Sequence, residues 1–370
     1  MNFYKITGSL FKRLLKYSVY QKNKHHFISR SKKIVKECKC KPLSRSQKKQ
    51  IKEYYARFGF KNINTRWHQF YTDLRGEFHK EYIPVELYTN VIEPQLNMLS
   101  EPEILTDKNL LDRLFNAIEQ PETIVKNING IFLDENRNIL DFDQVINKCL
   151  EYKKLIIKPS LDSGGGKNII VFELNGKQSN YEKLSIEELI SLYDKNFIIQ
   201  KYFIQHKTMS DLNKSSVNTL RIQSLLIDCE VMILASFVRI GGEGAVVDNS
   251  SHPTSGKSVI VCNVKEDGTL DKGYRGDGKI VTESNTNIKL ENYQIPNYSN
   301  IKIAVKNLHK QIPYFRIVSW DIAINEKGRP VLIEFNVSVQ GVHHQFATGT
   351  LFGEYTDKIL AQCTVNMFSN

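Results

Sequence analysis

The sequence predicts an α+β protein whose strands pair mainly antiparallel. Apolar strand-like runs follow each other directly across short turns, as residues 217–227 and 231–242 do on either side of Asp228. Amphipathic helical segments lie between such runs, but they do not alternate with them strictly, as they would in a doubly wound parallel sheet. A chain of 370 residues is also long enough for two or three subdomains that share a cleft.

The N-terminal sixth of the chain is strongly basic. Residues 1–60 contain 17 Lys and Arg but only two acidic residues, so the net charge of +11 arises almost wholly there. Within residues 3–17, apolar side chains recur at helical spacing between basic ones. We therefore expect residues 1–50 to form a basic amphipathic extension that continues, from about residue 20, as a polar linker or loose helices. A helical region is expected over 51–104.

This charge distribution limits the partners of the protein. A face for nucleic acid would need basic residues on the folded body, so we expect no nucleic-acid partner. No stretch approaches the roughly 18 apolar residues that span a bilayer, and the first residues lack the uninterrupted apolar core of a signal peptide. The basic helix could lie on an anionic membrane surface, or it could pack on the body or on a partner enzyme such as a glycosyltransferase.

The six cysteines form no recognisable disulfide or metal framework. Cys38 and Cys40 are separated by a single lysine, which suits neither a zinc knuckle nor a thioredoxin-like pair. Three of the others lie in apolar surroundings, as reduced core residues do. We therefore expect a cytoplasmic protein, peripheral at the inner face of the membrane if the basic extension binds lipid.

Residues 105–204 are expected to form one α+β subdomain. A helix is predicted over 105–115, with Thr106 or Asp107 as its N-cap. Two short strands should flank the turn Asn129-Gly130. The other expected elements are a helix from Asp141 to about Tyr152, a strand over 155–159, a strand after residue 168, a helix over 185–193 and a strand over 196–203.

Residues 205–370 are expected to form a second α+β subdomain. The antiparallel pair that turns at Asp228 comes first, and a polar, turn-rich stretch over 265–298 follows. The other expected elements are an amphipathic helix over 300–312, a hairpin over 316–336 with its turn at 326–328, and a final helix over about 351–363.

Lys158 ends a predicted buried strand and is followed at once by a glycine-rich turn over 161–167. The turn is not a Walker loop, because Leu161 stands where such a loop needs its first glycine and Asn168 where it needs Ser or Thr. A run of three glycines is also common in plain hairpins. The strand-end lysine favours a phosphate site, because its ammonium can reach phosphate oxygens that the N–H groups of the turn also contact.

A second group of polar residues lies on the C-terminal hairpin. Asp321 interrupts one apolar strand, and Glu334 and Asn336 lie two residues apart on its partner, so these two share a face while Ile333 and Phe335 point to the other. Two carboxylates and an amide oxygen form a hard oxygen site of the kind that Mg²⁺ prefers. The alternative is a set of solvated residues on an exposed face, but the apolar character of both strands favours the metal.

Together these features resemble the ATP-grasp superfamily, and in particular its sugar-transfer-associated branch from bacterial polysaccharide loci. The strand-end lysine, the glycine loop, the hinge-like FIIQKYF and the terminal Asp and Glu-x-Asn occur there in the same order. The stretches YIPVELYTNVIEPQLN, LTDKN, SSVNTLRI, VRIGGEGAVVDN, VSWDIAI and VLIEFN extend the match over roughly residues 80–350. The resemblance implies an ATP-grasp fold, in which two α+β subdomains clasp a nucleotide.

The resemblance also implies roles for individual residues. Phosphates of ATP would contact Lys108 and Lys158 beneath a mobile lid, and adenine would lie on the hinge. The lid residues would be Ser163, Gly164, Gly165 and Gly166, and the hinge residues would be Gln200, Lys201, Tyr202 and Phe203. One or two Mg²⁺ ions would bind Asp321, Glu334 and Asn336, and substrates would contact Arg221, Arg239, Asp248 and Asn249.

The expected catalytic residues are Lys158 and Arg239, the latter as a donor that stabilises an oxyanion. Either Arg221 or Arg239 could instead be the buried partner of a nearby acid. The chain departs from the family pattern at the ribose. Many relatives have an acidic residue just after the hinge, where this chain has Gln205-His206-Lys207.

The function that the resemblance implies is an ATP- and Mg²⁺-dependent ligase that joins a carboxylate to an amine or another nucleophile through an acylphosphate. Its substrates would be acidic sugars or amino-acid-type small molecules, as in amidation of a uronic acid of a bacterial surface polysaccharide. The same ATP site would also serve a kinase that phosphorylates a sugar or small-molecule hydroxyl. A third alternative is a non-catalytic partner that tethers a glycosyltransferase to the membrane, although a scaffold has no need of the lysine and metal set.

Two further pairs of residues are expected to be structural. His343 and His344 are adjacent, so on a strand they would point to opposite faces and would not form a joint site. Trp67 and Trp320 are expected to be core residues.

Overall fold

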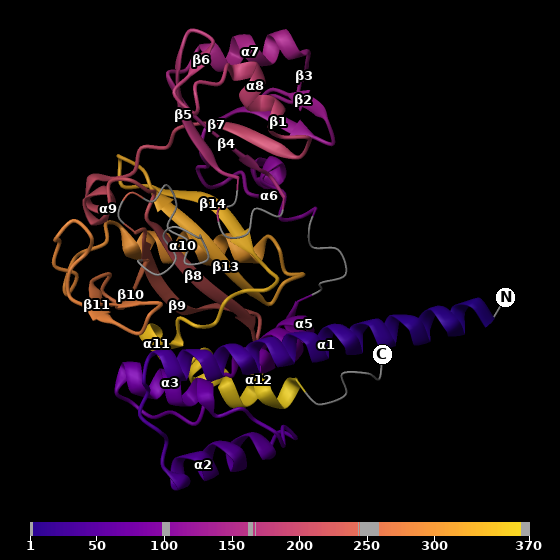
Figure 1. Ribbon diagram of the computed structural model, residues 1–370, viewed down its shortest axis with the longest axis vertical. Coiled ribbons are helices and arrows are strands. Elements are labelled where there is room, and N and C mark those ends of the chain that lie inside the picture. The colour runs from indigo at the N-terminus through magenta and orange to yellow at the C-terminus, as the bar shows by residue number, and fades with distance from the viewer. Residues whose placement is uncertain are drawn as a thin grey trace.

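The computed structural model describes residues 3–97, 104–161, 166, 168–242, 244 and 259–363, with side chains from residue 18 onward. Figure 1 shows three parts along the long axis: one sheet with helices beside it at the top, a second sheet in the middle, and a helical region at the bottom. Three clusters of buried apolar side chains form the core. The prediction of an α+β fold with antiparallel strands is confirmed.

The first sheet has seven strands in the order β3-β2-β1-β7-β4-β5-β6, and all its paired neighbours are antiparallel. Asn129 and Gly130 form the predicted turn, both with the positive φ that a tight hairpin requires. Helices α7 (Phe142–Leu150) and α8 (Ile186–Ser191) pack their apolar faces on this sheet. The strands are β1 (Thr123–Ile128), β2 (Ile131–Leu133), β3 (Ile139–Leu140), β4 (Lys154–Pro159), β5 (Ile170–Asn175), β6 (Gln178–Ser179) and β7 (Phe197–Lys201).

The second sheet also has seven antiparallel strands, in the order β12-β11-β10-β9-β8-β13-β14. The predicted pair that turns at Asp228 and the predicted hairpin with Gly328 in its turn are both present. Helix α10 (Tyr298–Lys310) packs on one face of the sheet. The strands are β8 (Thr219–Ile227), β9 (Glu230–Ile240), β10 (Ile260–Val264), β11 (Leu270–Arg275), β12 (Ile280–Val281), β13 (Ile317–Ile324) and β14 (Pro330–Asn336).

The helical region lies below the second sheet in Figure 1 and shares a core with it. Its longest element, α1 (Phe3–Glu37), is one continuous helix, so of the two expectations from about residue 20, a linker or loose helices, the structure has helix up to Glu37. The reason is that Phe27, Ile34 and Val35 pack against the core, and tertiary packing stabilises the helix despite its polar sequence. The other elements are α2 (Arg45–Ala56), α3 (Arg66–Arg75), α4 (Val85–Leu87), η1 (Tyr88–Ile92), α5 (Glu93–Leu96), α11 (Gln345–Thr348), η3 (Gly353–Tyr355) and α12 (Thr356–Gln362).

The predicted helix over 105–115 is shorter in the structure. It consists of the 3-10 turn η2 (Lys108–Leu110) and the single turn α6 (Leu111–Leu114). Asp107, one of the two predicted caps, accepts the backbone N–H of Asn109. The helix ends because Phe115 leaves the helical conformation and packs its ring against the second sheet.

Two remaining expectations concern the tryptophans and the chain end. Trp67 and Trp320 are fully buried, as predicted. The final helix begins at Thr356, after the turn η3, rather than near residue 351. Over the described part of the chain, no helix is both long and apolar enough to cross a membrane.

Candidate functional site

The two sheets enclose a cavity of about 320 Å³. Its lining comes from β4, β5 and β7 on one side and from β8, β9, β13 and β14 on the other. From the first side the lining residues are Lys154, Ile156, Lys158, Gly166, Ile169, Val171, Gln200, Lys201, Tyr202 and Phe203, with Lys108 and Pro121 before them. From the second side they are Lys214, Ser215, Val217, Thr219, Arg239, Asp321, Ile333 and Glu334. The cavity thus brings together lysines, hinge and carboxylates that are far apart in the sequence.

Lys158 ends β4 in this cavity, and it is only 6% exposed. Burial lowers the pKa of its ammonium to about 8; the charge of Lys108 acts in the same direction and that of Glu334 opposes it. Lys108 itself forms an ion pair of 3.1 Å with Glu334. Two lysines therefore lie near one carboxylate, an arrangement that favours the binding of a further anion.

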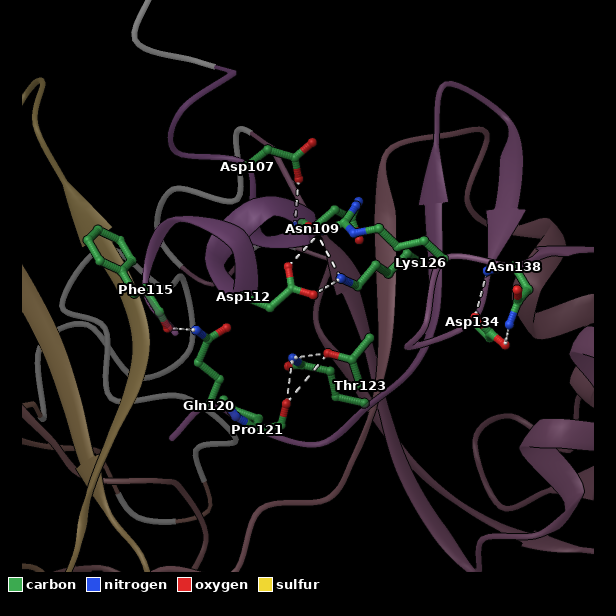
Figure 2. A network of polar contacts seen from close by, with 12 residues as sticks. Asp107, Asn109, Asp112, Phe115, Gln120, Pro121, Thr123, Lys126, Asp134 and Asn138 are labelled. Carbon is green, nitrogen blue, oxygen red and sulfur yellow. Dashed lines mark hydrogen bonds and ion pairs between the residues drawn. The ribbon is translucent and has the colours of Figure 1, made fainter. Parts of the chain in front are cut away.

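The segment that carries Lys108 is held by a network of polar contacts, shown in Figure 2. Asp107 accepts a hydrogen bond of 2.9 Å from the backbone N–H of Asn109. Lys126 on β1 is buried and forms an ion pair of 2.5 Å with Asp112. These contacts fix the backbone on both sides of Lys108, so its place at the cavity is set by the fold.

Asp321 and Glu334 lie directly opposite each other on β13 and β14. Asp321 is 1% exposed; Arg221 donates to both of its oxygens, with 2.7 Å from Nη2 to Oδ2, and Arg239 lies 3.3 Å from Oδ1. Burial raises the pKa of Asp321, and the two arginines act against that rise. Burial would also raise the pKa of Glu334, but the charge of Lys108 brings it well below its ordinary range.

Asn336, the third predicted metal ligand, lies two residues beyond Glu334 but does not line the cavity. Its amide nitrogen is buried, and no partner for it occurs among the described residues. A bulge next to Asp321 breaks the alternation of β14, so Ile333 lines the cavity beside Glu334, and the prediction that it points to the other face is wrong. Within the described ranges, no three His, Cys, Asp or Glu side chains form a metal site, so the predicted set depends on the amide of Asn336.

The hinge lies at the end of β7. Gln200 is 6% exposed, and its Nε2 donates to the carbonyl of Pro121 (3.4 Å) and to Oγ1 of Thr123 (3.2 Å). Its Oε1 is buried without a partner among the described residues. The amide nitrogen is thus held in place, and Gln200 forms part of the cavity lining at the hinge. Tyr202 follows, with the ammonium of Lys154 over its ring at 4.2 Å.

Some lining residues were missed by the sequence reasoning. Lys154 and Ile156 share a face of β4 with Lys158, and the period of two along a strand was the signal that could have found them. Lys214 and Ser215 follow α9 (Lys207–Leu212) and carry no signal of this kind. With these additions, six of the lining residues are Lys or Arg and two are acidic.

Not every predicted site residue lies at the cavity. Arg221 does not line it, because its guanidinium is bound to Asp321, the alternative that the sequence left open. Of the three residues after the hinge, none lines the cavity; Gln205 instead bonds the backbone of Ser216 and Asn218. The predicted residues that lie outside the described part of the chain are Ser163, Gly164, Gly165, Asp248 and Asn249.

His343 and His344 lie near the chain end but serve different contacts. His343 lies against Trp67, and His344 stacks on Phe237. Burial lowers the pKa of each imidazole to about 3, so both are neutral packing residues at ordinary pH.

Two antiparallel sheets that face each other across a basic cavity form the architecture of an ATP-grasp protein. The model of the family described as sugar-transfer associated ATP-grasp matches residues 89–359. This match covers well over half of the chain, and the chain therefore belongs to that family.

Several solved structures match at low similarity. They include the ATP-grasp ligase PsnB with its minimal precursor (14% identity, TM-score 0.38, 71% of this chain and 62% of that one). The VanG D-Ala:D-Ser ligase of Enterococcus faecalis has 14% identity, a TM-score of 0.39 and coverage of 70% and 62%. The L-amino acid ligase of Bacillus licheniformis has 14% identity and a TM-score of 0.35, and the match covers 75% of this chain and 50% of that one. The chain thus spans between 50% and 62% of the length of these proteins. A comparison with curated proteins gave no match.

Proposed function

We propose that this chain is an ATP- and Mg²⁺-dependent ligase that joins a carboxylate to an amine or another nucleophile. The observation that carries the proposal is the cavity, where Lys108 and Lys158 meet Asp321 and Glu334 beside the hinge. A scaffold has no need to bury charges from two sheets in one space, since each burial costs free energy. The excess of basic residues in the lining attracts a polyanion such as a triphosphate. Membership of the ATP-grasp family supports ATP as that polyanion.

Adenine would lie on the hinge over 200–203. Gln200 lines the cavity there, and an acceptor of the hinge would bind the exocyclic amino group of adenine, whereas guanine and hypoxanthine carry an oxygen at that position. Backbone groups of Lys201 and Phe203 would complete the recognition of the base. Apolar side chains such as Ile156 and Val171 line the same cavity and suit a flat ring. The phosphates would then extend toward Lys158.

The Mg²⁺ site would use Asp321, Glu334 and the amide oxygen of Asn336, which are the hard oxygen donors that this ion prefers. One or two ions bound there would neutralise charge on the phosphates and on the transferring group. Lys108 and Arg221 balance the two carboxylates in the structure. Phosphate oxygens offer Lys108, which lines the cavity, an equivalent anionic partner.

The reaction would proceed in two displacements. A carboxylate oxygen of the first substrate attacks the γ-phosphorus, the bond to the β–γ bridging oxygen breaks, and ADP leaves. Lys108 and Lys158 neutralise charge on the phosphoryl oxygens, which is mainly an electrostatic task. The amine of the second substrate then attacks the acyl carbon, and phosphate departs with the proton of the amine. Arg239, which lines the cavity, would stabilise the oxyanion with its fixed fork of donors.

The family description supports a proposal for the substrate class. An association with sugar transfer supports an acidic sugar as the carboxylate substrate and an amino-acid-type molecule as the nucleophile. Amidation of a uronic acid in a bacterial surface polysaccharide, or in its sugar precursor, is a reaction of this kind.

The experiment that tests the ligase is trapping with hydroxylamine. The chain is incubated with MgATP, a panel of acidic sugars and amino acids, and hydroxylamine, and the products are identified by mass spectrometry. A ligase should release ADP and yield a hydroxamate of the acidic substrate. Release of ADP with a stable phosphorylated sugar and no hydroxamate would identify a kinase instead. Absence of any MgATP binding would favour the non-catalytic partner.

We also propose that the N-terminal end of α1 contacts an anionic membrane surface. In Figure 1 this end of the helix extends well beyond the rest of the molecule. The sequence there combines apolar residues at helical spacing with Lys and Arg, which suits a surface of anionic headgroups. A glycosyltransferase that binds the same helix would be the alternative partner.

A further inference from the structure

The stretch YIPVELYTNVIEPQLN has no role in the proposed reaction, although the sequence marks it as part of the family pattern. It folds as α4, η1 and α5 in succession. η1 is a π-helix, in which the backbone N–H of Glu93 donates to the carbonyl of Tyr88. Such one-residue expansions of a helix occur often at functional positions. After it, α5 begins at Glu93 and is followed by its C-cap Asn97, whose backbone N–H donates to the carbonyl of Glu93.

Glu93 binds the loop that follows β14. Its side chain is buried, and its carboxylate accepts the backbone N–H groups of Val339 (2.8 Å) and Gln340 (2.9 Å). The amide of Gln340 in turn accepts the hydroxyl of Ser319 on β13 (2.6 Å). A carboxylate that binds two successive N–H groups fixes the backbone between them, and this loop begins directly after Asn336.

The bound loop is strained at Val339. This residue has a φ of 52°, a left-handed conformation that costs a β-branched side chain ~1–3 kcal/mol. Its side chain is 76% exposed, so burial does not offset the cost. The two hydrogen bonds to Glu93 do offset it. The loop therefore keeps this conformation because Glu93 holds it.

Asn97 binds the ends of the two strands that carry the carboxylates. Its Nδ2 donates to the carbonyls of Val337 (2.7 Å) and Ile317 (2.8 Å), and its Oδ1 accepts the N–H of Ile317 (3.0 Å). Ile317 begins β13, and Val337 follows the last residue of β14. One side chain thus joins the two strands at the end where Asn336 lies.

We propose that Glu93 and Asn97 are positioning residues that set the end of β14, and with it the alignment of Glu334 and Asn336 against Asp321. The inference rests on the proposed function. Neither residue lines the cavity, so both act through the backbone that they bind. The helical region is then part of the catalyst's support as well as a cover for the second sheet.

The test compares Glu93→Gln with Glu86→Gln. Glutamine keeps the shape of Glu93, but its amide has one acceptor oxygen where the carboxylate has two. One of the two backbone N–H groups that Glu93 binds therefore loses its partner. Glu86 is a matched control, because it is also buried in the helical region but binds the indole N–H of Trp67 instead of the loop. Three quantities are measured for each variant. Calorimetric titration with Mg²⁺ at a fixed ADP concentration gives the Mg²⁺ affinity. Amide hydrogen exchange without nucleotide gives the exchange rates at Val339 and Gln340, and thermal unfolding gives the melting temperature.

We expect Glu93→Gln to raise the Mg²⁺ concentration at half-saturation about tenfold, as loss of a group that supports metal ligands does, and to speed exchange at Val339 and Gln340. Glu86→Gln should change neither the Mg²⁺ concentration at half-saturation nor the exchange at Val339 and Gln340, while its melting temperature is similar to that of Glu93→Gln. Adding Val339→Gly to Glu93→Gln should restore part of the Mg²⁺ affinity, because glycine adopts the left-handed conformation without strain. Such rescue would not follow from a general loss of stability.

Unchanged Mg²⁺ dependence in a folded Glu93→Gln variant would overturn the inference. Should that variant not fold, Asn97→Ala tests the same strand end through Val337, with the same expected shift in the Mg²⁺ titration. A wild-type chain that binds no Mg²⁺ with ADP or ATP would instead refute the proposed function itself. The two failures can be distinguished. The inference fails when the wild type binds Mg²⁺ and the variant binds it equally well, whereas the proposed function fails when the wild type itself binds no Mg²⁺.

Discussion

The two walls of the cavity differ in how their charges are balanced. On the second sheet, Asp321 is bound by Arg221 from the neighbouring strand β8 and by Arg239 from β9, the next strand of the same sheet. On the first sheet, Lys158 is buried near another lysine, and the opposing charge of Glu334 comes from the other wall. Asp321 and its two arginines therefore form a structural unit within the acidic wall, whereas the lysine wall retains positive charge that an anionic ligand would balance.

Because of this difference, substitutions on the two walls should affect folding stability and nucleotide binding differently. Removal of an acid from the second sheet leaves buried arginines without a carboxylate, so folding should suffer. Removal of the lysine from the first sheet relieves an unfavourable burial, so folding should not suffer although nucleotide binding does. Substitutions on the two walls should therefore give opposite signatures, and the following predictions test this.

The largest effect is expected for Asp321→Asn. Because Arg221 and Arg239 then lose their buried partner, the free energy of unfolding should fall by about 3–5 kcal/mol, as measured by urea denaturation. Turnover should be lost as well, since a proposed metal ligand is removed. The matched control is Asp211→Asn, which breaks the surface ion pair with Lys207 and should change stability by less than about 1 kcal/mol. Equal stability of Asp321→Asn and wild type would show that the acidic wall is not a structural unit.

Lys158→Met should give the opposite result. ADP or ATP affinity should fall at least about a hundredfold, because a buried cation beside the proposed phosphate site is lost. The free energy of unfolding should stay constant or rise by up to about 2 kcal/mol, because an apolar side chain of similar length replaces a buried ammonium. Lys195→Met, at an exposed position outside the cavity, is the control for binding. A clear loss of stability in Lys158→Met would contradict the proposed asymmetry.

The pH dependence should report the same lysine. Its pKa in the folded chain is lowered to about 8 from 10.5, so nucleotide affinity should be highest below pH 8 and fall as the ammonium loses its proton above it. Between pH 8 and pH 10.5 the unfolded chain binds more protons at Lys158 than the folded chain does. The contribution of Lys158 to the free energy of unfolding therefore rises with pH across this window, by up to ~3 kcal/mol. Calorimetric titration with ADP at several pH values, with Lys158→Met as the reference, measures the first effect. An affinity that stays flat across this range would argue against phosphates near Lys158.

Local signals account for most of the fold that could be predicted. Asn129-Gly130 fixes one hairpin because few dipeptides adopt two positive φ angles in succession, and Asp141 caps its helix with a local capping box. The carboxylates on the C-terminal hairpin were found because polar residues interrupt apolar strands there. Each of these signals lies within a few residues of the structure it determines.

The parts that could not be predicted depend on distant contacts. The bulge that brings Ile333 into the cavity has no signature in the alternation of β14. Glu93 and Val339 are 246 residues apart, so no local pattern joins them. The length of α1 was missed for the same reason, because only packing on the distant core makes residues 20–37 of this polar helix stable.

The smallest effect on fold and chemistry is expected from removal of residues 1–18. Nucleotide affinity and the melting temperature should not change, because the packing side chains Phe27, Ile34 and Val35 remain. Binding to vesicles with anionic lipid should be lost at low salt, since each Lys or Arg near such a surface contributes about 1 kcal/mol. The control is Lys48→Gln, Lys49→Gln and Lys52→Gln on α2, which removes exposed basic charge from a helix whose other face is packed in the core. Sedimentation of the truncated chain with anionic vesicles at the wild-type level would show that the end of α1 is not the contact. A truncation at residue 40 could not make this distinction, because it removes buried core residues together with the basic end.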